Sequence, residues 1–260
     1  MKNVANVETV DKTRHANLRV KTNPDLVHAK DNNLAAVMLA ELGATACNFP
    51  IVFIQSPDSG QLRPAAMFGL RPGENVFYGA EGWDCTYVPV MIQRHPFVIG
   101  FDDRSEDPNQ LATCLIRTSP FVSETDGIAL FTETGEETDY LKSRHMLMRD
   151  IFEGERFLEE FMQKLKQLDL LTDLELQLQL SNGEGRRVTG MQTVNQAKMR
   201  ELTPEQVADL NKNDFLAACH LIMASVFQIH RLMQFRTRKQ IEAVTNYSIV
   251  IDPKSQQQAA

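Results

Sequence analysis

The sequence lacks the short motifs that mark the commonest nucleotide, zinc-protease and hydrolase sites. Its 260 residues contain no G-x-x-x-x-G-K-[ST], no G-x-G-x-x-G, no H-E-x-x-H and no G-x-S-x-G. Each of these patterns holds a phosphate group, a zinc ion or a reacting carbonyl at a defined place in a fold. The usual readings as a nucleotide-binding protein, a zinc protease or an α/β-hydrolase therefore have no support in the sequence.

Cysteine and histidine are also sparse and badly spaced for metal binding. The four cysteines, Cys47, Cys85, Cys114 and Cys219, are widely scattered and form no C-x-x-C pair. No two of the six histidines lie three to five residues apart, as a metal site on one helix would require. We therefore expect mainly buried free thiols, no metal site and no bound cofactor.

Long apolar runs and an excess of positive charge are missing as well. The longest strongly apolar stretch, Phe215–Phe227, is shorter than the roughly 20 residues that cross a bilayer. The polar N-terminus, through Arg14, lacks the apolar core of a secretory signal. The net charge of −7 argues against general affinity for nucleic acid or anionic lipid. These features predict a soluble cytoplasmic protein without membrane insertion and without a nucleic-acid partner.

Hydrophobic residues, at 43%, are plentiful enough for a real core in a chain of this length. The sequence predicts a flexible N-terminus over residues 1–13 and a single domain over residues 14–235. Residues 236–260 are expected to form an exposed tail, with one apolar segment at Tyr247–Ile251.

Hydrophobic patterns predict several antiparallel strands. Residues 51–54 and 63–70 flank a turn and form a hairpin, and residues 76–78 add a third strand to make a meander. Leu174–Leu180 alternates apolar and polar residues without an error, and residues 187–194 return beside it. Further strands are expected at residues 97–101 and 112–116, with short strands around Leu18–Val20 and at Ile128–Phe131.

Besides a brief helix that begins at Thr203-Pro204, three helices are expected. Asp31 caps the first, which runs to about Thr45, and the second is a long helix from Asp139 to Leu168. The third, over Phe215–Phe227, is apolar around nearly its whole circumference, which is typical of a buried central helix. The predicted class is α+β, with an antiparallel meander and hairpin sheet packed against the long helix and the buried C-terminal helix.

Polar and aromatic residues suggest one candidate ligand site. Glu41 lies near an apolar helical stripe, where a carboxylate needs a partner. Arg94 and His95 stand at the entrance to a strand, and an arginine and an imidazole beside aromatic rings could bind an anionic or aromatic ligand. The candidate ligand-binding residues are His15, Arg19, Glu41, Trp83, Tyr87, Arg94 and His95, and no catalytic residue is assigned.

Each of these residues also has a structural explanation. Arg94 could pair with Glu41 or with an acidic loop while the aromatic rings fill the core. His15 and Arg19 could belong to an edge strand with solvated basic side chains.

The order of several motifs resembles that of the SapC-like family of bacterial proteins. These motifs are His15-x-x-Leu18-Arg19-Val20, Glu41 with Phe49-Pro50-Ile51-Val52-Phe53, Gly69-Leu70-Arg71-x-Gly73-Glu74-Asn75, Trp83, Tyr87-Val88-Pro89, Arg94-His95-Pro96-Phe97, Ser119-Pro120, the hairpin at Leu174, residues 188–199 and the helix at Phe215. The resemblance covers about residues 14–235. The chain departs from the family pattern at Phe49, where a tyrosine is expected, and at Gln93 and His95, where an Arg-Tyr pair is expected.

The resemblance implies little about chemistry. The family name refers to bacterial surface layers, and some members are encoded near flavin-dependent halogenase-like proteins and TonB-dependent receptors. A peptide-transporter permease shares the label SapC, but the lack of transmembrane segments argues against that reading. The first hypothesis is a non-catalytic accessory or binding protein that works with a halogenase-like enzyme or a surface-assembly system. The alternatives are an enzyme of unknown chemistry with a site near Arg94 and His95, and a surface-layer component.

Overall fold

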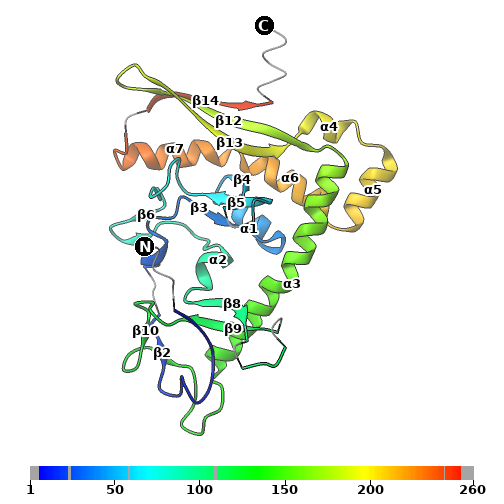
Figure 1. Ribbon diagram of the computed structural model, residues 1–260. Helices are drawn as coiled ribbons and strands as arrows, with labels where there is room; N and C mark the ends of the chain where they lie inside the picture. The colour runs from blue at the N-terminus through cyan, green and yellow to red at the C-terminus, as the bar shows by residue number, and fades with distance from the viewer. Residues whose placement is uncertain are drawn as a thin grey trace. The chain divides into compact units, whose positions relative to one another are not determined.

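The computed structural model describes residues 6–22, 25–57, 59–102, 104–107, 110–242 and 244–252 (Figure 1). Contacts between residues divide the chain into two compact units. The smaller unit comprises Met1–Leu26 and Met91–Arg156, and the larger unit comprises Val27–Val90 and Phe157–Ala260. The single domain expected over residues 14–235 stays a prediction, because a compact unit need not fold alone.

The smaller unit contains two small antiparallel sheets. In the first, β9 (Leu111–Ile116) lies between β1 (Val7–Thr9) and β8 (Phe97–Phe101). In the second, β2 (Arg19–Val20) lies between β10 (Val122–Ser123) and β11 (Ile128–Ala129). The strands expected at residues 97–101 and 112–116 are therefore confirmed, and they pair with each other.

The larger unit is built on a six-stranded antiparallel sheet with the order β14-β12-β13-β4-β5-β3. These strands are β3 (Leu34–Ala36), β4 (Ile51–Gln55), β5 (Leu62–Met67), β12 (Leu171–Leu180), β13 (Gly185–Val194) and β14 (Val244–Ile251). The short strands β6 (Tyr78–Gly79) and β7 (Gly82–Trp83) form a separate pair. The helical segments wholly within this unit are η1 (Val27–Ala29), η2 (Leu39–Glu41), α1 (Leu42–Ala46), α4 (Gln196–Arg200), α5 (Pro204–Lys212), α6 (Phe215–Ser225) and α7 (Gln228–Arg238).

Two helices have residues in both units: α2 (Val90–Gln93) and the 29-residue α3 (Asp139–Gln167). The bounds of α3 agree with the long helix expected from Asp139 to Leu168. With the antiparallel sheets and the C-terminal helices, α3 confirms the α+β class.

The alternating sequence of β12 explains why this strand anchors the larger sheet. Leu176, Leu178 and Leu180 are at most 4% exposed, whereas Gln177 and Gln179 between them are exposed. Glu175 is the exception on the polar face, because it is 4% exposed and pairs with Arg187. One face of the strand therefore enters the core and the other meets solvent. The hairpin of β12 and β13 is the one expected from this pattern.

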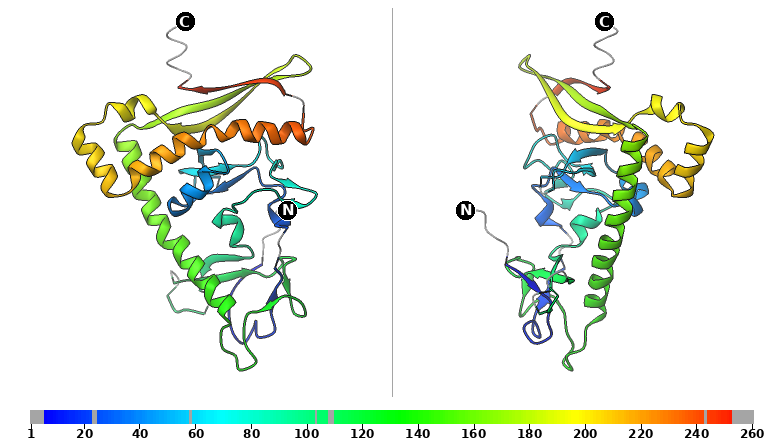
Figure 2. Two further views of the ribbon diagram at one scale, coloured as in Figure 1. Left: turned by 180° about the vertical axis from the view of Figure 1, so that it is seen from behind. Right: turned by 45° about the vertical axis from the view of Figure 1, so that its right-hand side comes forward.

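The helices α6 and α7 lie between β12–β14 on one side and β3–β5 on the other (Figures 1 and 2). The backbone N–H of Ile51 donates to the Ser225 hydroxyl over 2.9 Å, which joins the start of β4 to the end of α6. Cys219 and Ile222 on α6, and Ile229 on α7, have no exposed surface. One face of α6 therefore packs in the core of the larger unit, but Ala217, His220 and Ala224 are exposed, so the helix is not buried around its whole circumference as expected.

Phe215–Arg238, taken as one 24-residue helix, is long and apolar enough to cross a membrane by length and composition. This is weak evidence, because the core helix of a soluble protein meets the same test. In this chain, 44% of the most apolar window is buried.

The structure differs from the expected exposed tail after residue 235. Arg236 is 2% exposed, and its Nε and Nη2 atoms donate to Glu74 over 2.7 and 3.2 Å. Val244–Ile251 forms β14, which pairs along β12. The charged run Arg236–Lys239 resembled solvated surface in the sequence because its buried partner, Glu74, lies far away in the chain. Residues 253–260 of the expected tail lie outside the described residues.

Three further expectations need correction. Within the expected flexible N-terminus, Val7–Thr9 forms β1, which is too short to show a periodic pattern; residues 1–5 lie outside the described residues. The helix expected after Asp31 is replaced by β3 and two short helical segments, because β3 pairs with β5. That pairing also takes the position that the meander gave to residues 76–78.

Candidate functional site

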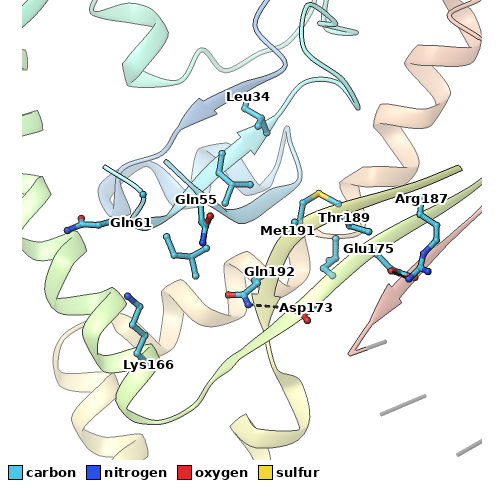
Figure 3. Close-up of a pocket in the computed structure, with 15 residues that line it drawn as sticks. Leu34, Gln55, Gln61, Lys166, Asp173, Glu175, Arg187, Thr189, Met191 and Gln192 are labelled. Carbon is cyan, nitrogen blue, oxygen red and sulfur yellow. Dashed lines mark hydrogen bonds and ion pairs between the residues drawn. The ribbon is translucent and has the colours of Figure 1, made fainter. Parts of the chain in front are cut away.

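An open groove of about 1080 Å³ lies between two hairpins of the larger unit (Figure 3). One wall comes from β4 and β5 and the other from β12 and β13, and Lys166 at the end of α3 contributes to the rim. In Figure 3, Gln61 and Lys166 lie at one end of the groove, while Glu175 and Arg187 lie at the other.

A β-bulge in β13 accounts for the opening. Leu174 faces Met191 across the hairpin and Leu176 faces Val188, so Thr189 and Gly190 together oppose Glu175 alone. Gly190 has φ +84°, a conformation that glycine adopts without steric cost. A bulge bends its strand and increases the local twist. Among the described residues, β13 and β4 pair only at Gln192 and Phe53. We attribute their separation beyond this point to the bend.

The groove consequently has a free strand edge along one side. The paired residues of β13 and β4 are Gln192 and Phe53 alone. From Gly185 to Met191, β13 is paired with β12 and has no strand partner on its other side among the described residues. Backbone groups on a free edge can accept another extended strand.

The lining combines apolar and polar side chains. The apolar lining residues are Leu34, Ile54, Leu62, Leu174 and Met191. The polar ones include Gln55, Gln61, Lys166, Asp173, Glu175, Arg187, Thr189 and Gln192. Such a combination is typical of sites that bury a ligand's apolar groups and orient it with a few polar contacts.

Most of the charged lining groups are already paired. Arg187 donates to Glu175 over 2.5 Å, and Gln177 donates to the same carboxylate over 2.7 Å; the bond from Arg187 is the main reason that the pKa of Glu175 is lowered. Gln192 donates to Asp173 over 3.0 Å. By contrast, the exposed ammonium of Lys166 forms no ion pair with any described residue. Lys166 is therefore the cation available to a ligand.

In the larger unit the structure brings three of the sequence-predicted site residues together. Glu41 is 6% exposed and accepts hydrogen bonds from the Tyr87 hydroxyl at 2.7 Å and from the backbone of Val90 and Met38, each at 2.9 Å. The indole N–H of Trp83 donates to the Tyr87 carbonyl over 2.9 Å. The buried carboxylate thus has the partners that its position requires.

In the cluster of Glu41, Trp83 and Tyr87, the polar side-chain atoms form hydrogen bonds to other groups of the protein. Burial, and then the bond to Glu41, raise the pKa of Tyr87. The ring of Trp83 lies 5.3 Å from that of Phe68 and 5.9 Å from that of Phe49, both in edge-to-face geometry. Glu41, Trp83 and Tyr87 therefore connect the loop after β7 to the core.

The remaining four predicted residues lie in the smaller unit. His15 is 1% exposed; its Nδ1 accepts from the Asp11 N–H over 2.9 Å, so Nε2 carries the hydrogen and donates to Glu8 over 3.1 Å. Arg19 donates to the Gly127 carbonyl over 3.1 Å. It also lines a second cavity, of about 500 Å³, between the loops around β2 and β11.

Arg94 and His95 precede β8. Burial lowers the pKa of Arg94, and its Nε makes no hydrogen bond among the described residues. His95 Nε2 is 3.0 Å from the Ser119 hydroxyl, within the reach of a base and a nucleophile. Ser119, however, is 6% exposed, and its Oγ also accepts from the Phe121 N–H over 3.2 Å.

The seven predicted residues thus fall into separate groups in the two units, and a joint site made from all of them stays a prediction. The sequence did not indicate the groove. Its one visible signal was Gly190, which interrupts the strand expected over residues 187–194.

Cysteines and metal-binding groups add no second site. Cys114 and Cys219 are buried and Cys85 is partly buried, as expected, but Cys47 is exposed; all four are free thiols. Among the residues that the structure describes, no three or more His, Cys, Asp or Glu side chains are grouped to hold a metal ion.

Comparisons with known proteins give one match. The family model described as SapC matches residues 10–232, which is most of the chain. Neither the curated proteins nor the solved structures contain a match.

Proposed function

The chain belongs to the SapC family, and we propose that it is a non-catalytic accessory protein that binds an extended segment of a partner protein in the groove between β4 and β13. One observation carries this proposal: among the described residues, β13 presents a free edge from Gly185 to Met191 beside a groove whose lining includes Ile54, Leu62 and Met191. Strand addition uses such an edge for main-chain hydrogen bonds and the adjoining surface for alternate side chains.

The lining defines the chemistry of the bound segment. Ile54, Leu62 and Met191 favour apolar side chains at every second position, because alternate residues of a strand point to the same face. The ammonium of Lys166 favours an acidic side chain or a terminal carboxylate at the α3 end of the groove. The segment would therefore be extended, alternating and acidic at one end.

The proposal includes a place of action and a kind of partner. The net charge of −7 favours solubility, and the proposal places the protein in the cytoplasm. The partner would be a halogenase-like enzyme or a component of a surface-assembly system, as the genomic setting of the family suggests. The protein would hold or present that partner and perform no chemistry on it.

A displayed library of random peptides, selected against the immobilised full-length protein, tests the proposal. We expect the selected peptides to alternate apolar residues and to carry an acidic group. Their affinity is then measured by fluorescence polarisation for the natural chain and for two groove variants, Ile54→Lys and Lys166→Glu. Each variant should weaken binding by about tenfold or more, which corresponds to about 1.4 kcal/mol.

Lys212→Glu is the matched control. Lys212, like Lys166, is an exposed lysine in the last turn of a helix, but it is not among the residues that line the groove. The control should bind the selected peptides as the natural chain does. Selection of no peptide, or equal affinity in all variants, would rule out the groove as a peptide site.

The contact between His95 and Ser119, together with the buried Nε of Arg94, favours a second candidate function, an enzyme with its site near Arg94 and His95. Arg94→Ala and His95→Ala chains, tested by complementation of a deletion strain, separate the two candidates. Loss of function in both, with peptide binding retained, would favour the enzyme. Full function in both would eliminate it.

A further inference from the structure

The strand β14 forms one edge of the larger sheet, next to β12 and on the side away from β13. Among the described residues it pairs with β12 alone, and the order β14-β12-β13-β4-β5-β3 places it at one end. Its sequence, Val244–Ile251, contains no charged residue and no proline. Natural sheets usually protect an edge of this length with lysine, proline or a covering element.

The hydrogen bonds show which backbone groups face outward. The N–H of Asp252, just after β14, donates to the Asp173 carbonyl of β12 over 2.9 Å, whereas the N–H of Tyr247 donates to the Asn246 side chain over 2.9 Å. In an antiparallel pair, alternate residues point their N–H and C=O groups toward the same neighbour. The backbone groups of Ile249, two residues further on, therefore face the free edge together with those of Tyr247.

Apolar and aromatic side chains adjoin this edge. Tyr247 bonds to His230 of α7 over 2.7 Å, and the His230 ring stacks with that of Phe227 at 6.4 Å between centroids. Phe227 is 71% exposed and Ile251 is 41% exposed. Exposed apolar side chains next to an open strand edge mark an interaction surface better than either feature alone.

We propose that β14 pairs in antiparallel fashion with β14 of a second copy of this chain, which joins the two six-stranded sheets into one. An antiparallel strand pair is self-complementary about a two-fold axis, as a symmetric dimer requires. The strand is uncharged although the chain carries a net charge of −7, so two copies meet at this edge without like charges facing each other.

The outward-facing groups define the register. The two-fold axis passes beside Ile249, so that Ile249 faces its own counterpart and Tyr247 faces Ile251 of the second copy. One pair of eight-residue strands buries less surface than a standard stable interface, so the dimer dissociates on dilution.

The oligomeric state of the full chain is measured by light scattering after size-exclusion chromatography over a wide range of concentrations. We expect the natural chain to become dimeric as its concentration rises. The Ser248→Lys/Val250→Lys chain should dissociate about tenfold more readily or worse, because four ammonium groups would gather on one face of the junction.

Gln177→Lys/Gln179→Lys is the matched control. Gln177 and Gln179 lie on β12, paired with Ser248 and Asn246, so the added charge is the same but is one strand away from the edge. The control should dimerise as the natural chain does. A natural chain that stays monomeric at every concentration, or two lysine variants that behave alike, would overturn the proposal.

Cysteine cross-linking tests the register independently of the lysine variants. In a Cys47→Ser background, which removes the exposed natural thiol, Ile249→Cys should give a disulfide-linked dimer on a non-reducing gel, because facing residues at this position lie about 5.5 Å apart between Cα atoms. Thr245→Cys should not, since the two copies of this position lie far apart in the proposed register. Equal cross-linking of the Ile249→Cys and Thr245→Cys chains would contradict the proposed register.

Discussion

The ion pair between Arg236 and Glu74 is the most deeply buried pair of opposite charges among the described residues. Their side chains are 2% and 4% exposed, and Glu74 also accepts from the backbone N–H of Leu70 over 3.1 Å. At this scale the sequence was informative for Glu41, whose carboxylate was expected to need a partner and has three hydrogen-bond donors. It was not informative for Arg236, because a run of basic residues looks the same whether solvent or a distant carboxylate covers it.

Replacing Arg236 by methionine should lower the free energy of unfolding by about 3 kcal/mol, because Glu74 would remain as a buried charge without its main cation. Urea unfolding monitored by circular dichroism measures the change. The Glu74→Gln/Arg236→Met chain should recover part of the loss, since the buried carboxylate, which among the described residues Arg71 alone would otherwise pair at 3.2 Å, is then gone. The control is Arg238→Met, a neighbouring exposed arginine of α7, whose replacement should change stability by about 0.5 kcal/mol or less. Equal losses of unfolding free energy in Arg236→Met and Arg238→Met would show that the buried pair stabilises the protein no more than an exposed arginine does.

At the scale of elements, alternation over Leu174–Leu180 was enough to predict β12, the segment that returns after the turn predicted β13, and a long helical stripe predicted α3. Sequence patterns did not predict the short elements. β3 has three residues and exists because β5 offers it a partner, which a local pattern does not reveal. The bulge at Thr189 and Gly190 has the same origin, since it is defined by how β13 aligns with β12. The groove, which depends on that bulge, could therefore not be located from the sequence.

Gly190→Ala tests the contribution of the bulge. A Cβ atom at Gly190 would meet open space, so the only cost is the backbone conformation at φ +84°, about 1–2 kcal/mol for a residue with a side chain. Gly185→Ala, on the same strand, also meets open space but has no left-handed φ, and it should leave stability unchanged or raise it slightly. The free energies of unfolding of both variants make the comparison. A loss of the same size in both would mean that the conformation of Gly190 is not what matters.

At the scale of the whole molecule, the α+β class and the family were both accessible from the sequence. The motifs that suggested the family lie within residues 14–235, and the family model matches residues 10–232. The division into two compact units was not accessible, because α3 and α2 pass from one unit to the other without any change in composition. The motifs near Arg94 and Glu41 could be recognised in the sequence. Which of the two units each motif belongs to is decided by the contacts between residues across the whole chain.

Cell fractionation addresses the whole chain and the apolar stretch of α6 and α7. We expect the protein in the soluble cytoplasmic fraction, because core residues of α6 such as Cys219 and Ile222 are fully buried against the sheet. A cytoplasmic enzyme and an integral membrane protein of the same cells serve as fraction markers. Recovery only in membranes washed with alkaline carbonate, with release by detergent, would instead identify Phe215–Arg238 as a membrane segment.

The buried ion pair also decides where this protein can be shortened. A fragment that ended at residue 232, the last position matched by the family model, would lose Arg236 and leave the Glu74 carboxylate inside the protein without it. It would also lose β14 and so turn β12 into an edge strand. A recombinant fragment of this chain should therefore extend at least to residue 252, even though family boundaries alone would suggest an earlier stop.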